Sequence, residues 1–177
     1  MIIGRHTYGA DKISIHHAPD RQLIIGSFCS IAENVTVMLG SNHRVDHITT
    51  YPFGHIHTDI FPYNNPNHPV SRGDIVIGND VWIARGVTIM SGVTIGSGAV
   101  IASNSHVVSS VPDYSIYGGN PAKLIRYRFS PSEIKDLLEI RWWEFDDCTI
   151  ISLLDCLCSC NIQEFIDVGF KIRQSLV

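Results

Sequence analysis

The sequence predicts a mainly-β fold in which the chain coils as a three-sided parallel β-helix, with one inserted loop and α-helices after the coil. Two observations carry this prediction. From residue 77 onward an aliphatic residue stands at every sixth position, and the same spacing appears before a gap at residues 41–70. Neither a helical period of about 3.6 residues nor strand alternation explains such spacing, whereas a coil of three short strands per turn does.

The repeats can be written as hexads, each opened by an aliphatic residue. After the gap the openers are Ile77, Ile83, Ile89, Ile95, Ile101 and Val107, and the small or β-branched residues in the fifth place are Val81, Val87, Val93, Ala99, Ser105 and Val111. Before the gap the openers are Ile25, Ile31 and Val37. We expect each opener to point to the axis, with a small residue or glycine beside it at a tight corner. Stacked turns then enclose a column of Ile and Val.

Composition bounds the class of protein. The chain has 177 residues, of which 17% are charged, and its formal net charge is -4, so it has no broad basic field to hold nucleic acid or an anionic membrane. The first nine residues lack a signal peptide's pattern, and no apolar run reaches the roughly 18 residues that span a bilayer. We therefore expect a cytoplasmic protein with no membrane span. The five cysteines are an odd number without zinc or redox spacing, which favours reduced, structural thiols.

The coil is expected to end before residue 130. Ser130-Pro131-Ser132-Glu133 has the pattern of a capping box with proline at the first helical position, and Asn161 to Glu164 suggests another helix start. The sequence thus divides into a β-helix with its inserted loop at residues 1–129 and a helical segment at residues 130–177. The part from residue 148 onward matches no motif.

The gap at residues 41–70 is an insertion rich in histidines, aromatic residues and prolines. Its histidines are His43, His47, His55, His57 and His68. A loop of this length without periodicity is unusual in a compact domain and is usually functional or disordered, and the aromatic residues and prolines argue against disorder. We therefore expect chemistry here.

At this point the sequence resembles a known family, the hexapeptide acyltransferases, and within it the xenobiotic acetyltransferases that modify chloramphenicol and streptogramins. The resemblance rests on motifs that keep their order from about residue 20 to residue 145. They are Ile25-Gly-Ser-Phe-Cys-Ser-Ile31, Gly40-Ser-Asn-His-Arg-Val-Asp-His47, Thr50-Tyr-Pro-Phe53, Ile77-Gly-Asn-Asp-Val-Trp-Ile83, Gly118-Gly-Asn-Pro-Ala-Lys123 and Arg141-Trp-Trp143.

The resemblance implies a left-handed β-helix that forms a homotrimer, with active sites in the clefts between neighbours. It implies acetyl-CoA as the donor and a small-molecule acceptor bound by the inserted loop. His43, directly after Asn42, takes the place of the family's catalytic histidine. Asn42, Asp46, Tyr51 and Phe53 are the expected acceptor-binding residues.

Histidine suits the role of general base because its pKa lies near the working pH. We expect Nε2 of His43 to contact the acceptor while Nδ1 is held by a carbonyl or a carboxylate, and Asp46 and Glu33 are the carboxylates nearby in sequence. A structural role is favoured for His55, His57 and His68, and the role of His47 stays open.

A metal site is the rival interpretation, since His43 and His47 have i, i+4 spacing. That spacing helps only on a helix, which the intervening residues do not favour, and the ligands of γ-carbonic anhydrases lie on the coils. We therefore expect no metal.

Coenzyme A is expected to bind along the coil and at its end. Trp82 closes its hexad and should point outward, where the resemblance makes it a wall for the pantetheine arm; packing against a neighbouring subunit is the compatible alternative. Small residues at Ala84 and Ala102 would leave backbone groups open to the pantetheine amides, with an N–H for the thioester oxyanion. Lys123 and Arg126 would hold the phosphate on the adenosine end of coenzyme A, or be ordinary solvated surface.

These expectations define an acetyl-CoA-dependent O- or N-acetyltransferase that forms no covalent enzyme intermediate. The acceptor is either a sugar in surface-polysaccharide synthesis or an antibiotic such as a streptogramin or chloramphenicol. The alternatives from other classes are a γ-carbonic-anhydrase-like zinc enzyme and a non-catalytic β-helix scaffold.

Overall fold

The structure is a computed structural model that describes residues 1–65 and 68–175. The chain divides into two compact units, Met1–Ile125 and Arg126–Val177. The boundary between the units lies within β13 (Lys123–Tyr127). It is a few residues before Ser130, the helix cap at which the sequence predicts the division.

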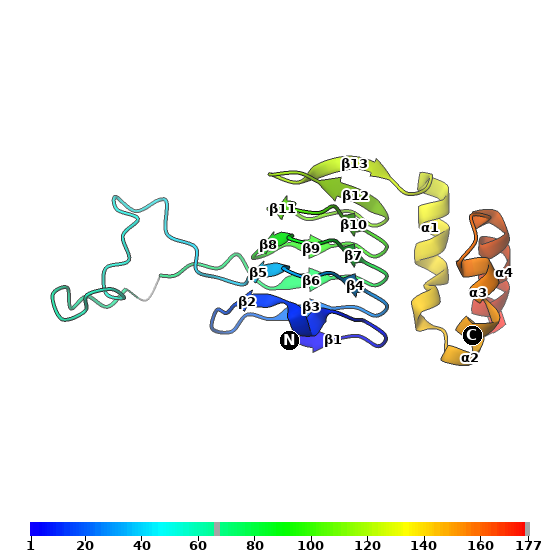
Figure 1. Ribbon diagram of the computed structural model, residues 1–177, viewed down its shortest axis with the longest axis horizontal. Coiled ribbons are helices and arrows are strands. Elements are labelled where there is room, and N and C mark those ends of the chain that lie inside the picture. Colours follow the sequence, from blue (N-terminus) through cyan, green and yellow to red (C-terminus); the bar gives the residue numbers. More distant parts are fainter. Residues whose placement is uncertain (66–67, 176–177) are drawn as a thin grey trace. The chain divides into compact units, whose positions relative to one another are not determined.

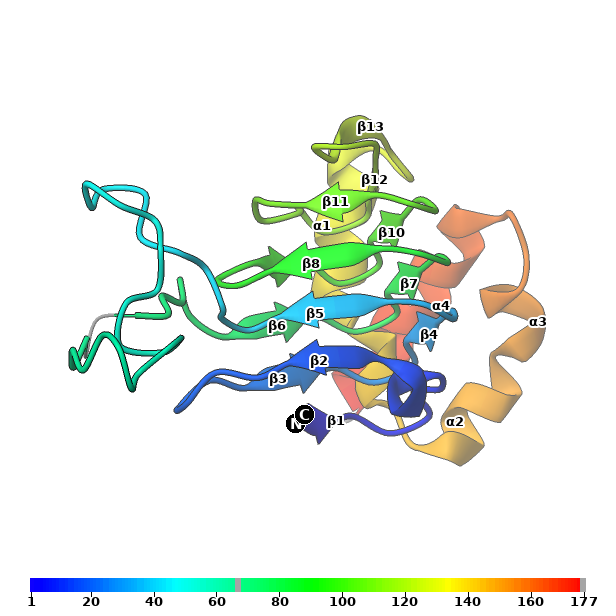
Figure 2. The same ribbon diagram turned by 60° about the vertical axis from the view of Figure 1, so that its left-hand side comes forward.

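The first unit is a coil of short strands stacked into three sheets (Figures 1 and 2). The first sheet holds, in order, β1 (Ile2–Ile3), β3 (Leu23–Ile25), β6 (Ile75–Ile77) and β9 (Thr94–Ile95). The second sheet holds β13 (Lys123–Tyr127), β12 (Ser115–Gly118), β10 (Val100–Ile101), β7 (Trp82–Ile83) and β4 (Ser30–Ile31). The third sheet holds β11 (His106–Val107), β8 (Thr88–Met90), β5 (Thr36–Met38) and β2 (Ser14–His16). A short 3-10 helix, η1 (Ala10–Lys12), precedes β2. Successive hexads therefore pass from one face to the next, as the six-residue period predicts.

The register of the strands stacks the aliphatic openers above one another. Ile25 pairs with Ile77 and Ile77 with Ile95, and in the same way Ile83 pairs with Ile31 and Ile101 on the second face. The openers are buried, and so are the residues in the fifth place of each hexad. The predicted column of aliphatic side chains is confirmed, and the backbones pair in parallel between turns.

The corners of the coil show a feature that the hexads predict only in part. In the fourth place of the five hexads that open with Ile77 to Ile101 the backbone has positive φ, at Asp80, Gly86, Gly92, Gly98 and Asn104. Glycine, Asn and Asp adopt this conformation most readily. The residue beside the opener is tightly packed as expected, because a Cβ on Gly26 would lie 2.4 Å from the carbonyl oxygen of Gly78. The bend itself, however, lies two residues further along.

The second unit is helical. It contains α1 (Pro131–Ile140), η2 (Trp142–Glu144), α2 (Asp147–Ser152), α3 (Leu154–Leu157) and α4 (Ile162–Ser175). The capping box at the start of α1 is confirmed, because the side chain of Ser130 accepts from the Glu133 N–H while Glu133 accepts from the Ser130 N–H. The Asn161 side chain likewise accepts from the Glu164 N–H at the start of α4. Both predicted helix starts are therefore present.

The insertion leaves the coil after β5 and rejoins it before β6. Its described residues form no helix or strand, only isolated bridges, and it extends away from the coil (Figure 1). Within residues 1–65 and 68–175, no helix has both the length and the apolar character needed to cross a bilayer.

Candidate active site

The two ends of the insertion are fastened to each other and to the coil, in a segment we call the neck (residues 39–43 and 68–73). Asn42 and Val70 exchange backbone hydrogen bonds of 3.2 and 2.8 Å. The buried Ser91 then accepts two hydrogen bonds, one from Asn42 Nδ2 and one from the Arg72 N–H, each at 3.1 Å. Ser71 Oγ donates to the carbonyl of Leu39 at 2.5 Å. These hydrogen bonds therefore fix the backbone immediately before the residue that follows Asn42.

That residue is His43. Its side chain is exposed, and its Nδ1 lies 2.7 Å from the carbonyl oxygen of Thr50. A carbonyl only accepts hydrogen bonds, so Nδ1 carries the hydrogen and Nε2 keeps its lone pair. The ring therefore has the tautomer that a general base needs.

The group that holds Nδ1 is thus a carbonyl, not one of the two carboxylates. Asp46 is instead bound by Arg44, whose Nε donates to Asp46 Oδ1 at 2.7 Å. This hydrogen bond is the main reason that the pKa of Asp46 falls from 3.8 to about 2. Glu33 lies 3.7 Å from Lys12 Nζ. The sequence could not identify Thr50 as this partner, because every residue has a main-chain carbonyl and residue type does not show which carbonyl lies next to His43.

Three of the loop's histidines gather at the neck. The ring of His68 lies 4.8 Å from that of His43 and 5.2 Å from that of His55, measured between centroids. Desolvation lowers the pKa of His68, and the charges on His43, His55 and His47 lower it further. Among residues 1–65 and 68–175, no group of three His, Cys, Asp or Glu side chains is arranged to hold a metal ion. The zinc-enzyme interpretation therefore lacks a ligand set in this part of the chain.

An aromatic cluster follows directly after Thr50. The rings of Tyr51 and Phe53 lie 4.7 Å apart, and those of Phe53 and Phe61 lie 5.0 Å apart. Tyr51 and Phe61 are exposed, while Phe53 is half-buried. The predicted acceptor residues Tyr51 and Phe53 therefore share one apolar surface. Asn42, by contrast, is engaged in the neck, and Asp46 is engaged by Arg44.

Trp82 does not lie with this group. Its side chain points outward and is 54% exposed, as its place in the hexad predicts. It stands on β7 in the second sheet, whereas the insertion leaves from the corner between the third and first sheets. In a three-sided coil this corner is opposite the second sheet, and Figures 1 and 2 both show β7 on the far side of the coil from the insertion. A single chain therefore does not bring His43 and Trp82 together.

The expectation that Ala84 or Ala102 offers a free N–H to the oxyanion is wrong. The N–H of Ala84 donates to the Ile101 carbonyl at 3.0 Å, and the N–H of Ala102 donates to the Tyr117 carbonyl at 2.8 Å. Stacking of the turns uses these donors, because each strand pairs with the strand above.

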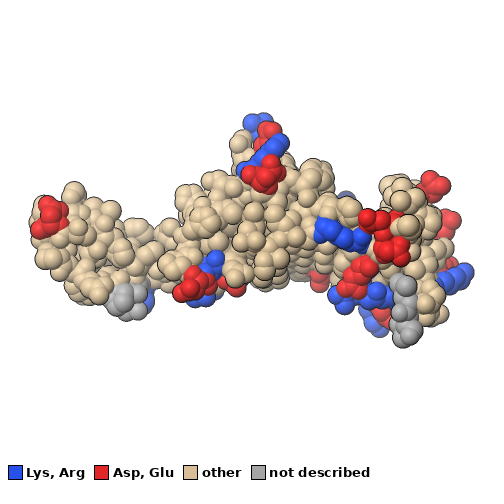
Figure 3. All heavy atoms as spheres, turned by 90° about the horizontal axis from the view of Figure 1, so that it is seen from below, with Lys and Arg blue, Asp and Glu red and all other residues tan. Residues whose placement is uncertain are grey.

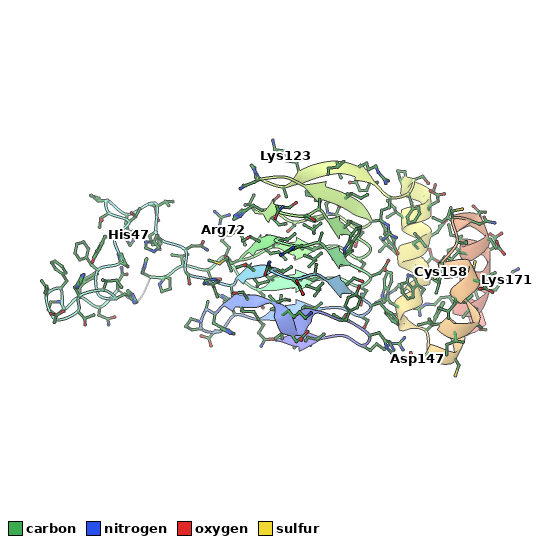
Figure 4. The ribbon with its side chains drawn as sticks, in the orientation of Figure 1. His47, Arg72, Lys123, Asp147, Cys158 and Lys171 are labelled. Atoms are coloured by element: carbon green, nitrogen blue, oxygen red, sulfur yellow. The ribbon has the colours of Figure 1, made fainter. Side chains whose placement is uncertain are left out.

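The two basic residues near the end of the coil are exposed on β13. Lys123 and Arg126 are three residues apart, an odd spacing that points the side chains to opposite faces of a strand. They therefore do not form one cluster on a single face. In Figure 4, Lys123 lies at the last turn of the coil, Arg72 at the neck and His47 out on the insertion. Few charged side chains appear on the coil in the view of Figure 3.

Comparison with known proteins defines the class. Residues 74–109 match the family model of the bacterial transferase hexapeptide, six repeats. A hexapeptide-repeat acetyltransferase of Vibrio cholerae, solved in complex with acetyl coenzyme A, is similar with a TM-score of 0.52 and 28% identity, covering 72% of this chain and 60% of that one. The chain thus spans about three-fifths of that protein's length, and the match defines a hexapeptide-repeat fold.

Curated relatives narrow the class further. The chain is 51% identical over 145 residues to a probable macrolide acetyltransferase of Lysinibacillus sphaericus, covering 78% of each chain. It is 40% identical over 163 residues to a chloramphenicol acetyltransferase of Escherichia coli, covering 89% of this chain and 78% of the relative. The chain belongs to the hexapeptide acyltransferases, in the xenobiotic acetyltransferase subfamily, and is an acetyltransferase. The resemblance seen in the motifs is confirmed.

Proposed function

We propose that this enzyme transfers the acetyl group of acetyl-CoA to a hydroxyl of a small acceptor, with His43 as the general base. The observation that carries the assignment is the contact between His43 Nδ1 and the Thr50 carbonyl, which leaves Nε2 free to accept a proton. Use of acetyl-CoA as the donor is supported by the Vibrio cholerae relative that binds it.

Acetyl-CoA supplies an activated thioester, and the protein supplies a base and a fixed geometry. Nε2 of His43 takes the proton as the acceptor oxygen attacks the acetyl carbonyl, and the imidazolium then returns this proton to the departing thiolate. A covalent enzyme intermediate is not required. Cys29 is a poor nucleophile because it is fully buried in the coil and burial raises its pKa.

The proposal includes a left-handed coil and a homotrimer whose sites are shared between subunits. The position of Trp82, opposite the corner from which the insertion leaves, supports a shared site. In a trimer with cyclic symmetry, the insertion of one subunit can reach the Trp82 face of its neighbour. In that arrangement Trp82 and the small residues Ala84 and Ala102 line the path of the pantetheine arm, while Lys123 or Arg126 contacts the phosphate.

The acceptor is proposed to have both a hydroxyl and an apolar face. The apolar surface made by Tyr51, Phe53 and Phe61 follows Thr50 directly, and it suits an antibiotic of the kinds named for the curated relatives, chloramphenicol or a macrolide. The insertion after Phe53 is rich in His and Asn, which favours a sugar hydroxyl as the second candidate. Asn42 and Asp46 act indirectly in this scheme, through the neck and through Arg44.

Thiol release from acetyl-CoA tests the activity and the acceptor together. The panel holds chloramphenicol, a macrolide, a streptogramin and free and nucleotide-linked sugars. We expect turnover with one class, and His43→Ala to lower kcat by about 10²- to 10⁴-fold because a general base contributes that much. Acetyl-CoA should still bind the variant, as measured by calorimetry. His17→Ala, an exposed histidine on the coil, is the matched control. Full activity in His43→Ala would exclude the mechanism.

Mixed oligomers test the shared site. His43→Ala and Trp82→Ala subunits, each weakly active alone, are dissociated and reassembled together. If a site takes His43 from one subunit and Trp82 from the next, some sites in the mixture regain both residues and activity rises above that of either parent. Activity that stays at the average of the two parents would show that each subunit holds a whole site.

A further inference from the structure

His68 stands where the neck brings two distant parts of the chain together. The backbone bridge between Asn42 and Val70 is antiparallel, so the residues just beyond it on each strand of the neck face one another. His43 follows Asn42 directly, and His68 precedes Val70 by two residues. The two imidazoles are therefore neighbours although they lie far apart in the sequence.

The contact between the two rings is edge to face. Their centroids lie 4.8 Å apart and their planes are inclined by 88°, a geometry that aromatic rings favour. The hydrogen bond from Nδ1 to the Thr50 carbonyl fixes one corner of the His43 ring, but a single hydrogen bond leaves the ring free to tilt about it. A second ring against its side removes that freedom.

His68 is itself held in place. It is half-buried, whereas His43 is exposed. Its ring packs on that of His55 at 5.2 Å, and its N–H donates to the carbonyl of Asn65 at 3.3 Å. The charged groups that act on it are His43, His55 and His47, which together with desolvation lower the pKa of His68. A proton taken up by His43 therefore disfavours a second proton on the neighbouring His68 ring.

We propose that His68 is a positioning residue for His43: its ring, together with the Thr50 carbonyl, orients the base so that Nε2 faces the acceptor. This inference rests on the proposed role of His43 as the base. It assigns His68 a part in the reaction, where the sequence favours a purely structural role.

Nuclear magnetic resonance of the ring nitrogens tests the proposal without turnover. The intact enzyme is labelled with ¹⁵N-histidine, and the signals of His43 are identified by their loss in His43→Ala. In the wild type we expect one tautomer, with hydrogen on Nδ1. In His68→Ala we expect averaging between the two tautomers of His43. In His68→Phe, which keeps a ring that cannot titrate, we expect the wild-type tautomer. His17→Ala is the control for loss of an exposed histidine.

Kinetics supply the second readout. His68→Ala should lower kcat by roughly 10- to 100-fold, since a misplaced base costs about that much, with the KM for acetyl-CoA unchanged, while His68→Phe keeps most of the activity. Wild-type His43 signals in His68→Ala, or a His68→Phe variant as impaired as His68→Ala, would overturn the proposal. If the wild type acetylates no acceptor, the proposed function fails, but the resonances still decide whether His68 orients His43.

Discussion

The coil and the insertion use similar apolar residues in opposite surroundings. In the coil the side chain of Ile89 has no exposed surface, and its backbone pairs with the strands of two neighbouring turns. In the insertion Ile48 and Val45 are almost wholly exposed, at 109% and 87%, and the described backbone there forms only isolated bridges. The periodic part of the chain thus holds its own structure, while the irregular part presents side chains outward.

The two regions therefore have different roles: the coil stabilises the fold, and the insertion presents the side chains proposed to act in the reaction. Burial of aliphatic surface in the coil stabilises the fold, and the loop carries the histidine proposed as the base on that support, as loops on rigid scaffolds commonly do. His43 stands where the two regions meet, one residue beyond the bridge that closes the neck. A base placed there combines exposure to substrate with a fixed backbone.

The largest effect on stability is expected from an isoleucine in the coil. Ile89→Ala should lower the free energy of unfolding by about 2–5 kcal/mol, because it removes buried surface and leaves a cavity. Ile60→Ala, the same change at a position 63% exposed in the insertion, should cost less than about 0.5 kcal/mol. Urea unfolding measures both. Equal costs would mean that Ile60 is packed as tightly as Ile89 in solution.

A smaller effect is expected at the neck. Ser91→Ala removes the acceptor of two hydrogen bonds and leaves the Arg72 N–H unpaired, a loss of about 1–3 kcal/mol. We expect faster hydrogen exchange at Asn42 and Val70 and a lower kcat, because His43 then starts from a less ordered backbone. Ser115→Ala, a change at a buried serine of the coil away from the neck, is the control. It should leave kcat and exchange at the neck unchanged; a kcat in Ser91→Ala equal to that of the control would contradict the role of the neck.

The smallest effect is expected in the exposed pair of Arg44 and Asp46. Because the folded pKa of Asp46, about 2, lies below the ordinary 3.8, its contribution to stability is present above about pH 4 and is lost as the pH falls toward 2. Asp46→Asn should therefore unfold slightly more easily than the wild type at neutral pH, and the difference should vanish near pH 2. Thermal unfolding followed across this range measures it. A difference that persists at the acid end would show that the ion pair is not its source.

Much of the fold could be predicted because the hexads carry a period that only a three-sided coil satisfies. The openers, the outward Trp82 and the capping box at Ser130 all follow from the spacing of residue types. The corner was predicted less well. Its bend at the fourth place depends on backbone dihedrals that Asp80 and Phe28 adopt as well as glycine, so residue type alone did not locate it.

The candidate site was predictable in its residues but not in its partners. The motif around Asn42 and His43 and the aromatic residues of the loop could be selected from the sequence. The backbone donors of Ala84 and Ala102 could not be judged, because whether an N–H is free depends on the turn stacked above it.

The sequence by itself determined the repeat, the place of the insertion and the histidine that acts as the proposed base, because periodicity and local motifs are properties of neighbouring residues. Only the tertiary structure decided that the Thr50 carbonyl holds His43, that His68 packs against its ring, and that Trp82 lies on the opposite face of the coil. These arrangements involve residues that are separated along the chain, such as His43 and His68, or main-chain groups, such as the Thr50 carbonyl, that every residue type carries. Their distances follow from how the turns stack and how the neck closes, which no local pattern records.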